Sequence, residues 1–209
     1  MPPKANDAIA AALADLKDEI KSIHSKLDSH FQLFSTQENK IKNLELLTND
    51  LEQHQRLHSV RIFGLPLPPT DTNDPFAVTH HVYTALTPIL EIAKDKKSLP
   101  CIPPLLDTID ISHTLPSRDN STPPIIVRFK SKLIRLAVMR HKKAYFTNNS
   151  DHKFSITDDL TRKNSLLLKF TKERSDVASA WSSGCKIKFK LKSDPNKILT
   201  ASITALPSH

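Results

Sequence analysis

Apolar side chains recur at alternating three- and four-residue intervals along the N-terminal part of the chain, and residues 7–57 contain no proline or glycine. With Leu13 at heptad position a, the apolar seam positions are Ile9, Leu13, Leu16, Ile20, Ile23, Leu27, Phe34, Ile41, Leu44 and Leu51. A 3.5-residue repeat sustained this long predicts a left-handed coiled coil. The polar His30 and Gln37 fall on the same seam, where they weaken packing but can set register. The alternative is a single amphipathic helix packed on its own domain, but a helix of about 75 Å would overhang any small domain.

From Ser59 onward the apolar pattern changes, and short alternating segments follow between helical ones. The pattern predicts strands at 60–66, 107–113, 123–130 and 154–157, and helices at 76–93 and 132–143. The first helix carries an apolar side made of Val78, Val82, Leu86, Ile89 and Leu90. The order β-α-β-β-α-β is the split βαβ plan of RNA-recognition folds.

The last fifty residues predict a second small unit. Thr161 is a suitable N-cap for a helix over residues 162–182, and Gly184 suits the position after its end. The apolar stripe expected on this helix is Leu166, Phe170, Val177 and Trp181. Residues 186–192 alternate lysine with apolar side chains, and residues 198–203 are the expected hairpin partner.

These patterns predict an α+β protein in three parts. A coiled-coil helix covers residues 1–58, a non-standard RNA-recognition-like domain covers 59–157, and a basic helix-plus-hairpin domain covers 158–209.

Charge is distributed unevenly over the 209 residues, which carry a net +8. Residues 128–209 hold 18 Lys or Arg against 6 Asp or Glu, and the rest of the chain is mildly acidic. This asymmetry indicates a polyanionic partner. With only two glycines, the chain has neither a dinucleotide fingerprint nor a P-loop. Two distant cysteines form no disulfide framework or zinc pattern, and no apolar stretch suggests a membrane span or signal peptide, so we expect a soluble intracellular protein without a cofactor.

Five motifs in fixed order carry a resemblance that extends over residues 10–200. They are VRIFGLP (60–66), IDISHTLPSR (109–118), PPIIVRFKSKLIRLAVMRHKK (123–143), FSITDDLT (154–161) and AWSSGCKIKFK (180–190). The chain resembles the first-open-reading-frame proteins of LINE-type non-LTR retrotransposons, in the branch that shares its C-terminal part with the baculovirus few-polyhedra protein.

The resemblance implies a homotrimeric coiled coil, an RNA-recognition domain and a small C-terminal domain. Together they would bind single-stranded RNA, with single-stranded DNA as a second ligand, and coat the element's transcript in a cytoplasmic ribonucleoprotein that can also be nuclear. Nucleic-acid chaperone activity is implied as well. The mixture of Leu and Ile at a and d is by itself compatible with dimer or trimer. The third strand lacks the paired stacking aromatics of the standard RNA-recognition octamer, so backbone contacts should dominate.

Candidate contact residues fall into three groups. On neighbouring first and third strands, Arg61 and Phe63 should share a face with Arg128 and Lys130, a platform for phosphates and one stacked base. The alternatives are a solvated charged face, or an ion pair of Arg61 with an acid. The second group is the basic helix and its approach: Lys130, Lys132, Arg135, Arg140, Lys142 and Lys143. Tyr145 and Phe146 follow in an expected loop, as stacking or core residues.

The third group lies in the C-terminal domain. It comprises Lys169, Lys172, Lys186, Lys188 and Lys190. The resemblance implies a basic RNA contact on the last helix, which Lys169 matches best. Lysines two apart on a strand are spaced about 6.6 Å, close to a single-strand phosphate repeat; an edge strand charged against aggregation is the alternative. Trp181 is expected in the core.

An enzyme is not predicted. Asp158 and Asp159 precede a helix, where negatively charged side chains interact favourably with the helix dipole. His80 and His81 lack a third metal ligand at useful spacing, and Cys185 has no His or acid placed by sequence to activate it. The competing function is a protein-interaction adaptor resembling the few-polyhedra protein, in which the basic surface would contact an acidic protein.

Overall fold

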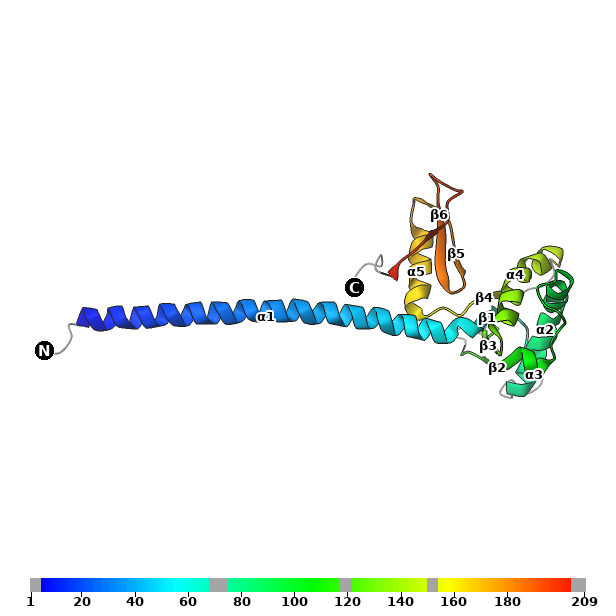
Figure 1. The fold of residues 1–209 in the computed structure, drawn as a ribbon, viewed down its shortest axis with the longest axis horizontal. Helices are drawn as coiled ribbons and strands as arrows, with labels where there is room; N and C mark the ends of the chain where they lie inside the picture. Colours follow the sequence, from blue (N-terminus) through cyan, green and yellow to red (C-terminus); the bar gives the residue numbers. More distant parts are fainter. Residues whose placement is uncertain (1–4, 68–74, 117–121, 150–153, 204–209) are drawn as a thin grey trace. The chain divides into compact units, whose positions relative to one another are not determined.

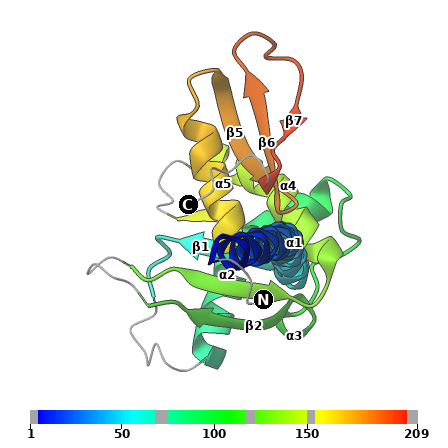
Figure 2. The same cartoon turned by 90° about the vertical axis from the view of Figure 1, so that its left-hand side faces the viewer.

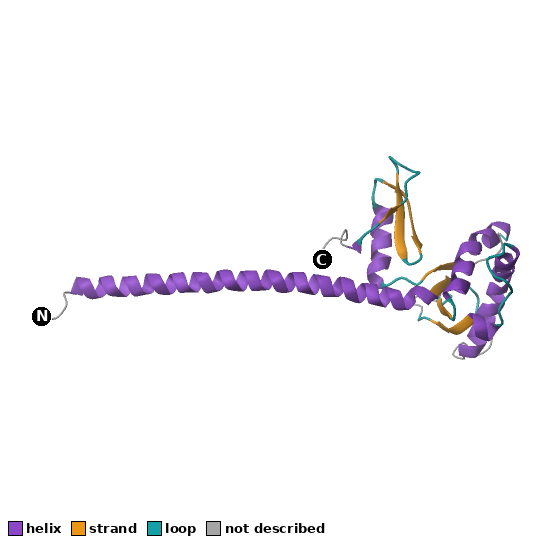
Figure 3. Cartoon of the chain, in the orientation of Figure 1, coloured by secondary structure: helices purple, strands orange, loops and turns teal. Residues whose placement is uncertain are grey.

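The computed structural model describes residues 5–67, 75–116, 122–149 and 154–203. Ser117 and Arg118, the end of the motif IDISHTLPSR, lie outside these ranges. The chain is α+β as predicted: a long N-terminal helix is followed by two antiparallel sheets and further helices (Figure 3). It forms two compact units that divide between Thr48 and Asn49.

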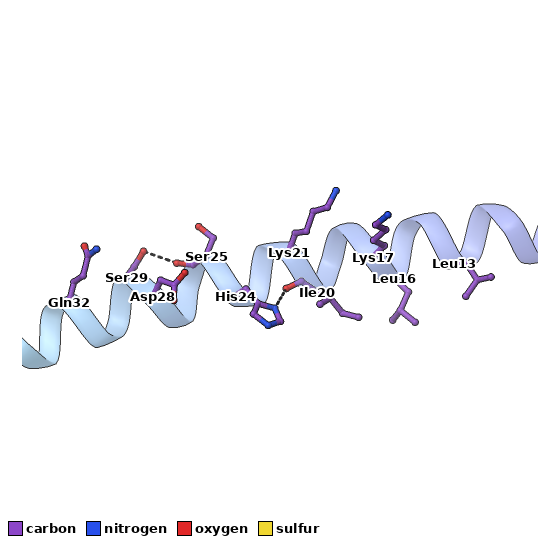
Figure 4. Close-up of a pocket in the computed structure, with 10 residues that line it drawn as sticks. All are labelled: Leu13, Leu16, Lys17, Ile20, Lys21, His24, Ser25, Asp28, Ser29 and Gln32. Carbon is purple, nitrogen blue, oxygen red and sulfur yellow. Dashed lines mark hydrogen bonds between the residues drawn. The ribbon is translucent and has the colours of Figure 1, made fainter.

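Helix α1 (Ala5–Gln55) contains 51 residues, which confirms the predicted long helix (Figure 1). All ten predicted seam residues are exposed in the single chain, with 46% to 64% of their surface accessible. Phe31, Leu33 and Leu47, at flanking e and g positions, are exposed too. Figure 4 shows Leu13, Leu16 and Ile20 on one side of the helix and Lys17 and Lys21 on the other. The helix is compatible with a coiled coil.

The first sheet contains four strands in the order β2-β3-β1-β4, all antiparallel to their neighbours. After the 3-10 turn η1 (Arg56–His58), the elements are β1 (Ser59–Phe63), α2 (Pro75–Asp95), α3 (Leu105–Thr108), β2 (Ile109–Thr114), β3 (Ile125–Phe129), α4 (Lys132–Asn148) and β4 (Ser155–Asp158). The predicted β-α-β-β-α-β order is therefore confirmed, with the one-turn α3 in addition. Strands β1 and β3 are neighbours, as expected, and pair Arg61 with Ile126.

The core of this part lies between the sheet and the helices α2 and α4. Alternate residues of β1 and β3 face inward, including Val60, Ile62, Ile125 and Val127. All five predicted apolar residues of α2 are buried against them. Because side chains alternate across a strand, Arg61, Phe63 and Arg128 belong to the opposite, outer face of the sheet.

The C-terminal part contains α5 (Arg162–Glu173) and a second sheet of β5 (Val177–Ser183), β6 (Lys186–Leu191) and β7 (Leu199–Thr200), in the order β5-β6-β7 (Figure 2). Thr161 is the N-cap of α5, as predicted, and its hydroxyl accepts a hydrogen bond from the Asn164 amide at 3.2 Å. Leu160 and Leu167 pack with Cys185 and Ile187 to form a small second core.

The predicted helix over residues 162–182 is wrong beyond Glu173, and Val177 and Trp181 lie in β5 instead. Gly184 does not end a helix. It and Cys185 have φ of 60° and 63° and form the two-residue turn between β5 and β6, a geometry that matches strand twist. The alternating segment after the turn needs an antiparallel partner, and the residues before the turn supply it.

The predicted stripe of α5 is also wrong, because it assumed a helix that continued to Trp181. Leu167 and Thr171 face the core, whereas Leu166 is exposed. The helix packs on β5 and β6, and the position of that small sheet selects a face displaced by one residue from the expected one.

The last two turns of α1 belong to the folded unit. Gln53 donates to the Asp159 carbonyl at 2.9 Å and accepts from the Thr161 amide at 3.0 Å. Asn49 accepts from the Thr161 hydroxyl at 2.7 Å. These buried bonds fix the helix end beside the start of α5, while Leu51 of the seam remains exposed on another side of the helix.

Candidate nucleic-acid interface

A cleft of about 400 Å³ opens between the outer face of the first sheet and the C-terminal part. It is lined by Arg61, Phe63, Lys142, Thr157, Asp158, Leu160, Ser165, Leu168, Lys172, Ala180, Trp181 and Ser182. These residues come from β1, α4, β4, α5 and β5 and from the segment between β4 and α5. The cleft therefore depends on the tertiary fold, since its walls are far apart in sequence.

The chemistry of the cleft is basic and aromatic. Arg61, Lys142 and Lys172 each contribute a cationic side chain from a different element. Phe63 is 40% exposed and Trp181 is partly exposed, so both aromatic side chains are in part accessible to solvent. Cations that follow a backbone, together with rings on which bases stack, are the combination that holds single-stranded nucleic acid.

Arg61 occupies the outer sheet face, and it also makes the ion pair that was considered as an alternative. Its Nε donates to Asp159 Oδ1 at 2.7 Å, while 31% of the side chain stays exposed. Arg128, on the neighbouring strand, is exposed and lies 3.5 Å from Asp110. The sheet face is thus less purely cationic than expected, because each arginine has a carboxylate beside it.

Arg135 is not on the exposed basic face expected from the helical pattern. It is only 2% exposed, and its Nη2 forms an ion pair with the buried carboxylate of Asp158. The same nitrogen lies 3.7 Å from the Cys185 sulfur, and Asp158 accepts a 3.4 Å bond from the Cys185 amide. Arg135 therefore joins α4 to the β5–β6 turn and is not available to a ligand.

Lys142 lines the cleft and is half-buried, and its Nζ donates to the Ile156 carbonyl. Burial lowers the pKa of Lys142, because the charged ammonium loses solvation. The nearby Asp158 opposes this shift, and Arg135 adds to it.

The remaining predicted residues of the basic helix and its approach are solvent-exposed. They are Lys130, Lys132, Arg140 and Lys143, and none of them lines the cleft. Tyr145 and Phe146 lie in α4 and not in a loop, because the helix continues to Asn148. Tyr145 is buried in the core, and Phe146 packs against Phe154 with ring centroids 5.2 Å apart.

The lysines of β6 alternate with buried Ile187 and Phe189, as the pattern predicted. They do not lie on an edge strand, because β6 is central between β5 and β7. Lys188 is the cross-strand partner of Trp181, and Lys186 and Lys190 pair with Ser183 and Ser179. Directly opposed residues share a sheet face, so these three lysines and Trp181 form one continuous surface.

The two candidate lysines of α5 differ in position. Lys172 lines the cleft, whereas Lys169 is exposed elsewhere on the helix and lies 3.9 Å from Glu173. The structure thus brings Lys172 together with Arg61 and Lys142, and leaves Lys169 outside.

Three important residues were not expected from the sequence. Trp181 was expected in the core, and Asp158 and Asp159 were expected to act through the helix dipole. Both carboxylates are buried among arginines. The two-residue turn at Gly184 was the available signal for Trp181, because it makes the preceding segment a strand. Nothing in the local sequence indicated the burial of Asp158 and Asp159, because their arginine partners are far away in the sequence.

Other kinds of site find little support in the described part of the chain. It contains no group of three His, Cys, Asp or Glu side chains that could hold a metal ion. None of its helices is long and apolar enough to cross a bilayer. Burial raises the pKa of the Cys185 thiol to about 11, the opposite of an activated cysteine. Comparison with protein-family models and with curated proteins finds no match for this chain.

Proposed function

We propose that this protein is a non-enzymatic, oligomeric binder of single-stranded RNA with tolerance for sequence. The observation that carries the proposal is the cleft that Arg61, Lys142 and Lys172 line together with the part-exposed Phe63 and Trp181. Cations would contact phosphates and rings would contact bases of any identity. Affinity should therefore depend on the length of the strand and not on its base sequence. The lysine face of β6 continues this surface beyond the cleft through Trp181.

The exposed seam of α1 supports the oligomeric part of the proposal. A stripe of large apolar side chains that runs from Ile9 to Leu51 is costly to leave in water, and a coiled coil would cover it. Joined copies raise the effective concentration of each weak site for the same strand, so affinity grows without new contacts. The motif resemblance favours a trimer, and it favours a retrotransposon transcript, coated as a ribonucleoprotein and remodelled by chaperone activity, as the ligand.

A matched pair of variants tests the cleft. Lys172→Gln and Lys169→Gln each remove one exposed lysine from α5, but only Lys172 lines the cleft. Each phosphate contact contributes about −0.7 to the slope of log K against log salt for a single strand. Titration of the full chain with a uridine homopolymer at several salt concentrations should show a shallower slope and weaker binding for Lys172→Gln alone.

The proposal would be overturned if the unaltered protein failed to bind, if binding were insensitive to salt, or if the two variants behaved alike. Salt-insensitive RNA binding combined with retention of an acidic protein would instead favour the adaptor function. Sedimentation of the full chain measures the strand number directly, and a monomer at micromolar concentration would contradict the oligomeric part.

A further inference from the structure

The buried carboxylate of Asp159 contacts two arginines, one of which, Arg61, lines the cleft. Its Oδ1 accepts from Arg61 Nε at 2.7 Å and from Arg56 Nη1 at 3.2 Å. Only 4% of the Asp159 side chain is exposed. Arg56 also donates to Glu52 at 2.5 Å, so a line of alternating charges runs from the end of α1 to Arg61 in the cleft.

The backbone around Asp159 is held as firmly as its side chain. The Asp159 carbonyl accepts from Gln53, and the Leu160 carbonyl accepts from Arg56 at 3.4 Å. The preceding strand residues, Thr157 and Asp158, pair with Arg61 and Val60 in the sheet. The carboxylate therefore has a defined place beside β1, set by contacts that do not involve the Arg61 side chain.

The bond to Asp159 uses only one edge of the Arg61 guanidinium. Among the described residues, no hydrogen bond involves its two terminal Nη groups, which carry four of its five N–H donors. A long arginine side chain loses rotamer freedom when it binds a phosphate, and a side chain that is already fixed loses less.

We propose that Asp159 is a positioning residue for nucleic-acid binding: its buried carboxylate holds Arg61 at the cleft wall with the terminal Nη groups available to a phosphate of a single strand. This inference rests on the proposed function. It predicts a change in affinity opposite in sign to that expected from charge alone. Removal of a negative charge close to a polyanion site should strengthen binding through electrostatics alone, whereas loss of positioning should weaken it.

The test compares Asp159→Asn with Arg61→Gln, their double variant and Glu52→Gln, in the full chain with the same uridine homopolymer. Asp159→Asn should weaken binding about three- to tenfold, the effect of one side chain that must be immobilised on binding. In the Arg61→Gln background the same change should have less than about a twofold effect. Glu52→Gln is the matched control: it removes a carboxylate that contacts Arg56 and not Arg61, and should leave affinity within about twofold.

The variants should fold, because each charge keeps a partner or solvent. Asp159 keeps Arg56 when Arg61 is replaced, and Arg56 keeps Glu52 when Asp159 is replaced. Arg61→Lys, at the same part-exposed position, provides a second test. Lysine retains the positive charge but lacks the Nε that bonds to Asp159, so this variant should bind as weakly as Asp159→Asn.

The results separate the two proposals. Unchanged or tighter binding by Asp159→Asn, equal loss in the Arg61→Gln background, or full affinity of Arg61→Lys would overturn the positioning role and leave the proposed function intact. Absence of RNA binding by the unaltered protein would overturn both.

Discussion

The buried ion pair of Arg135 and Asp158 should be a major determinant of stability in the folded unit. Both side chains are at most 2% exposed, and they join α4 to the end of β4 and to the turn at Cys185. Loss of one member leaves an uncompensated charge in the interior, which costs about 3–5 kcal/mol. Typical domains are stable by about 5–15 kcal/mol in total. Arg135→Met or Asp158→Asn should therefore each remove a large part of the free energy of unfolding.

The double variant gives the more informative measurement. Arg135→Met with Asp158→Asn removes both charges, and the asparagine oxygen can still accept the Cys185 amide hydrogen bond. It should recover most of the loss, because the cost in each single variant is that of an unpaired charge and not of a missing attraction.

Urea unfolding can be followed through Trp181, the only tryptophan in the chain. The midpoint and slope of each transition give the free energy of unfolding. Additive losses, with the double variant as unstable as both single changes combined, would refute this reasoning, as would single variants within about 1 kcal/mol of the unaltered protein.

Three further measurements follow from local geometry. Gly184→Ala should cost about 1–2 kcal/mol, because φ is +60° while the space around an added Cβ is open, and Gly184→Asn should cost less; equal losses in urea unfolding would contradict this. At pH 8 a thiol reagent should label the exposed Cys101 of the folded protein and leave Cys185 unlabelled, because the Cys185 thiol is buried and its pKa is raised. Labelling of both cysteines without denaturant would contradict this prediction. The pKa of Lys142 in the folded protein is lowered from its usual 10.5. Between that lowered pKa and 10.5 the unfolded chain binds more protons than the folded one, so stability should rise with pH. Lys142→Met should reduce the increase of the free energy of unfolding with pH. An unchanged pH profile of stability would exclude Lys142 as its cause.

Several elements could be predicted because each has one buried face that is visible in a short window. The alternation of Ile125, Val127 and Phe129 predicted β3, and the helical spacing from Val78 to Leu90 predicted α2. The ends of elements were less predictable where the apolar pattern fits two periods. Residues 177–181 satisfied a helical stripe, but the turn at Gly184 and the pairing with β6 make them a strand.

The candidate site divides in the same way. The basic character of the C-terminal region and the positions of Arg61, Phe63 and Lys172 could be read from residue type and local pattern. The burial of Arg135 could not, because its partner Asp158 is 23 residues away, and Arg61 and Asp159 are 98 residues apart.

By itself, then, the sequence determined the long helix with its apolar seam, the order of strands and helices around the first sheet, and the concentration of positive charge after residue 128. Those properties depend on residue type and on spacing along the chain. Only the tertiary structure decided which cations face a common cleft, that Trp181 borders it, and that the carboxylates of Asp158 and Asp159 are buried with arginine partners. The physical reason is that the cost of burying a charge, and hence whether it stays exposed, depends on partners that folding brings from distant parts of the chain.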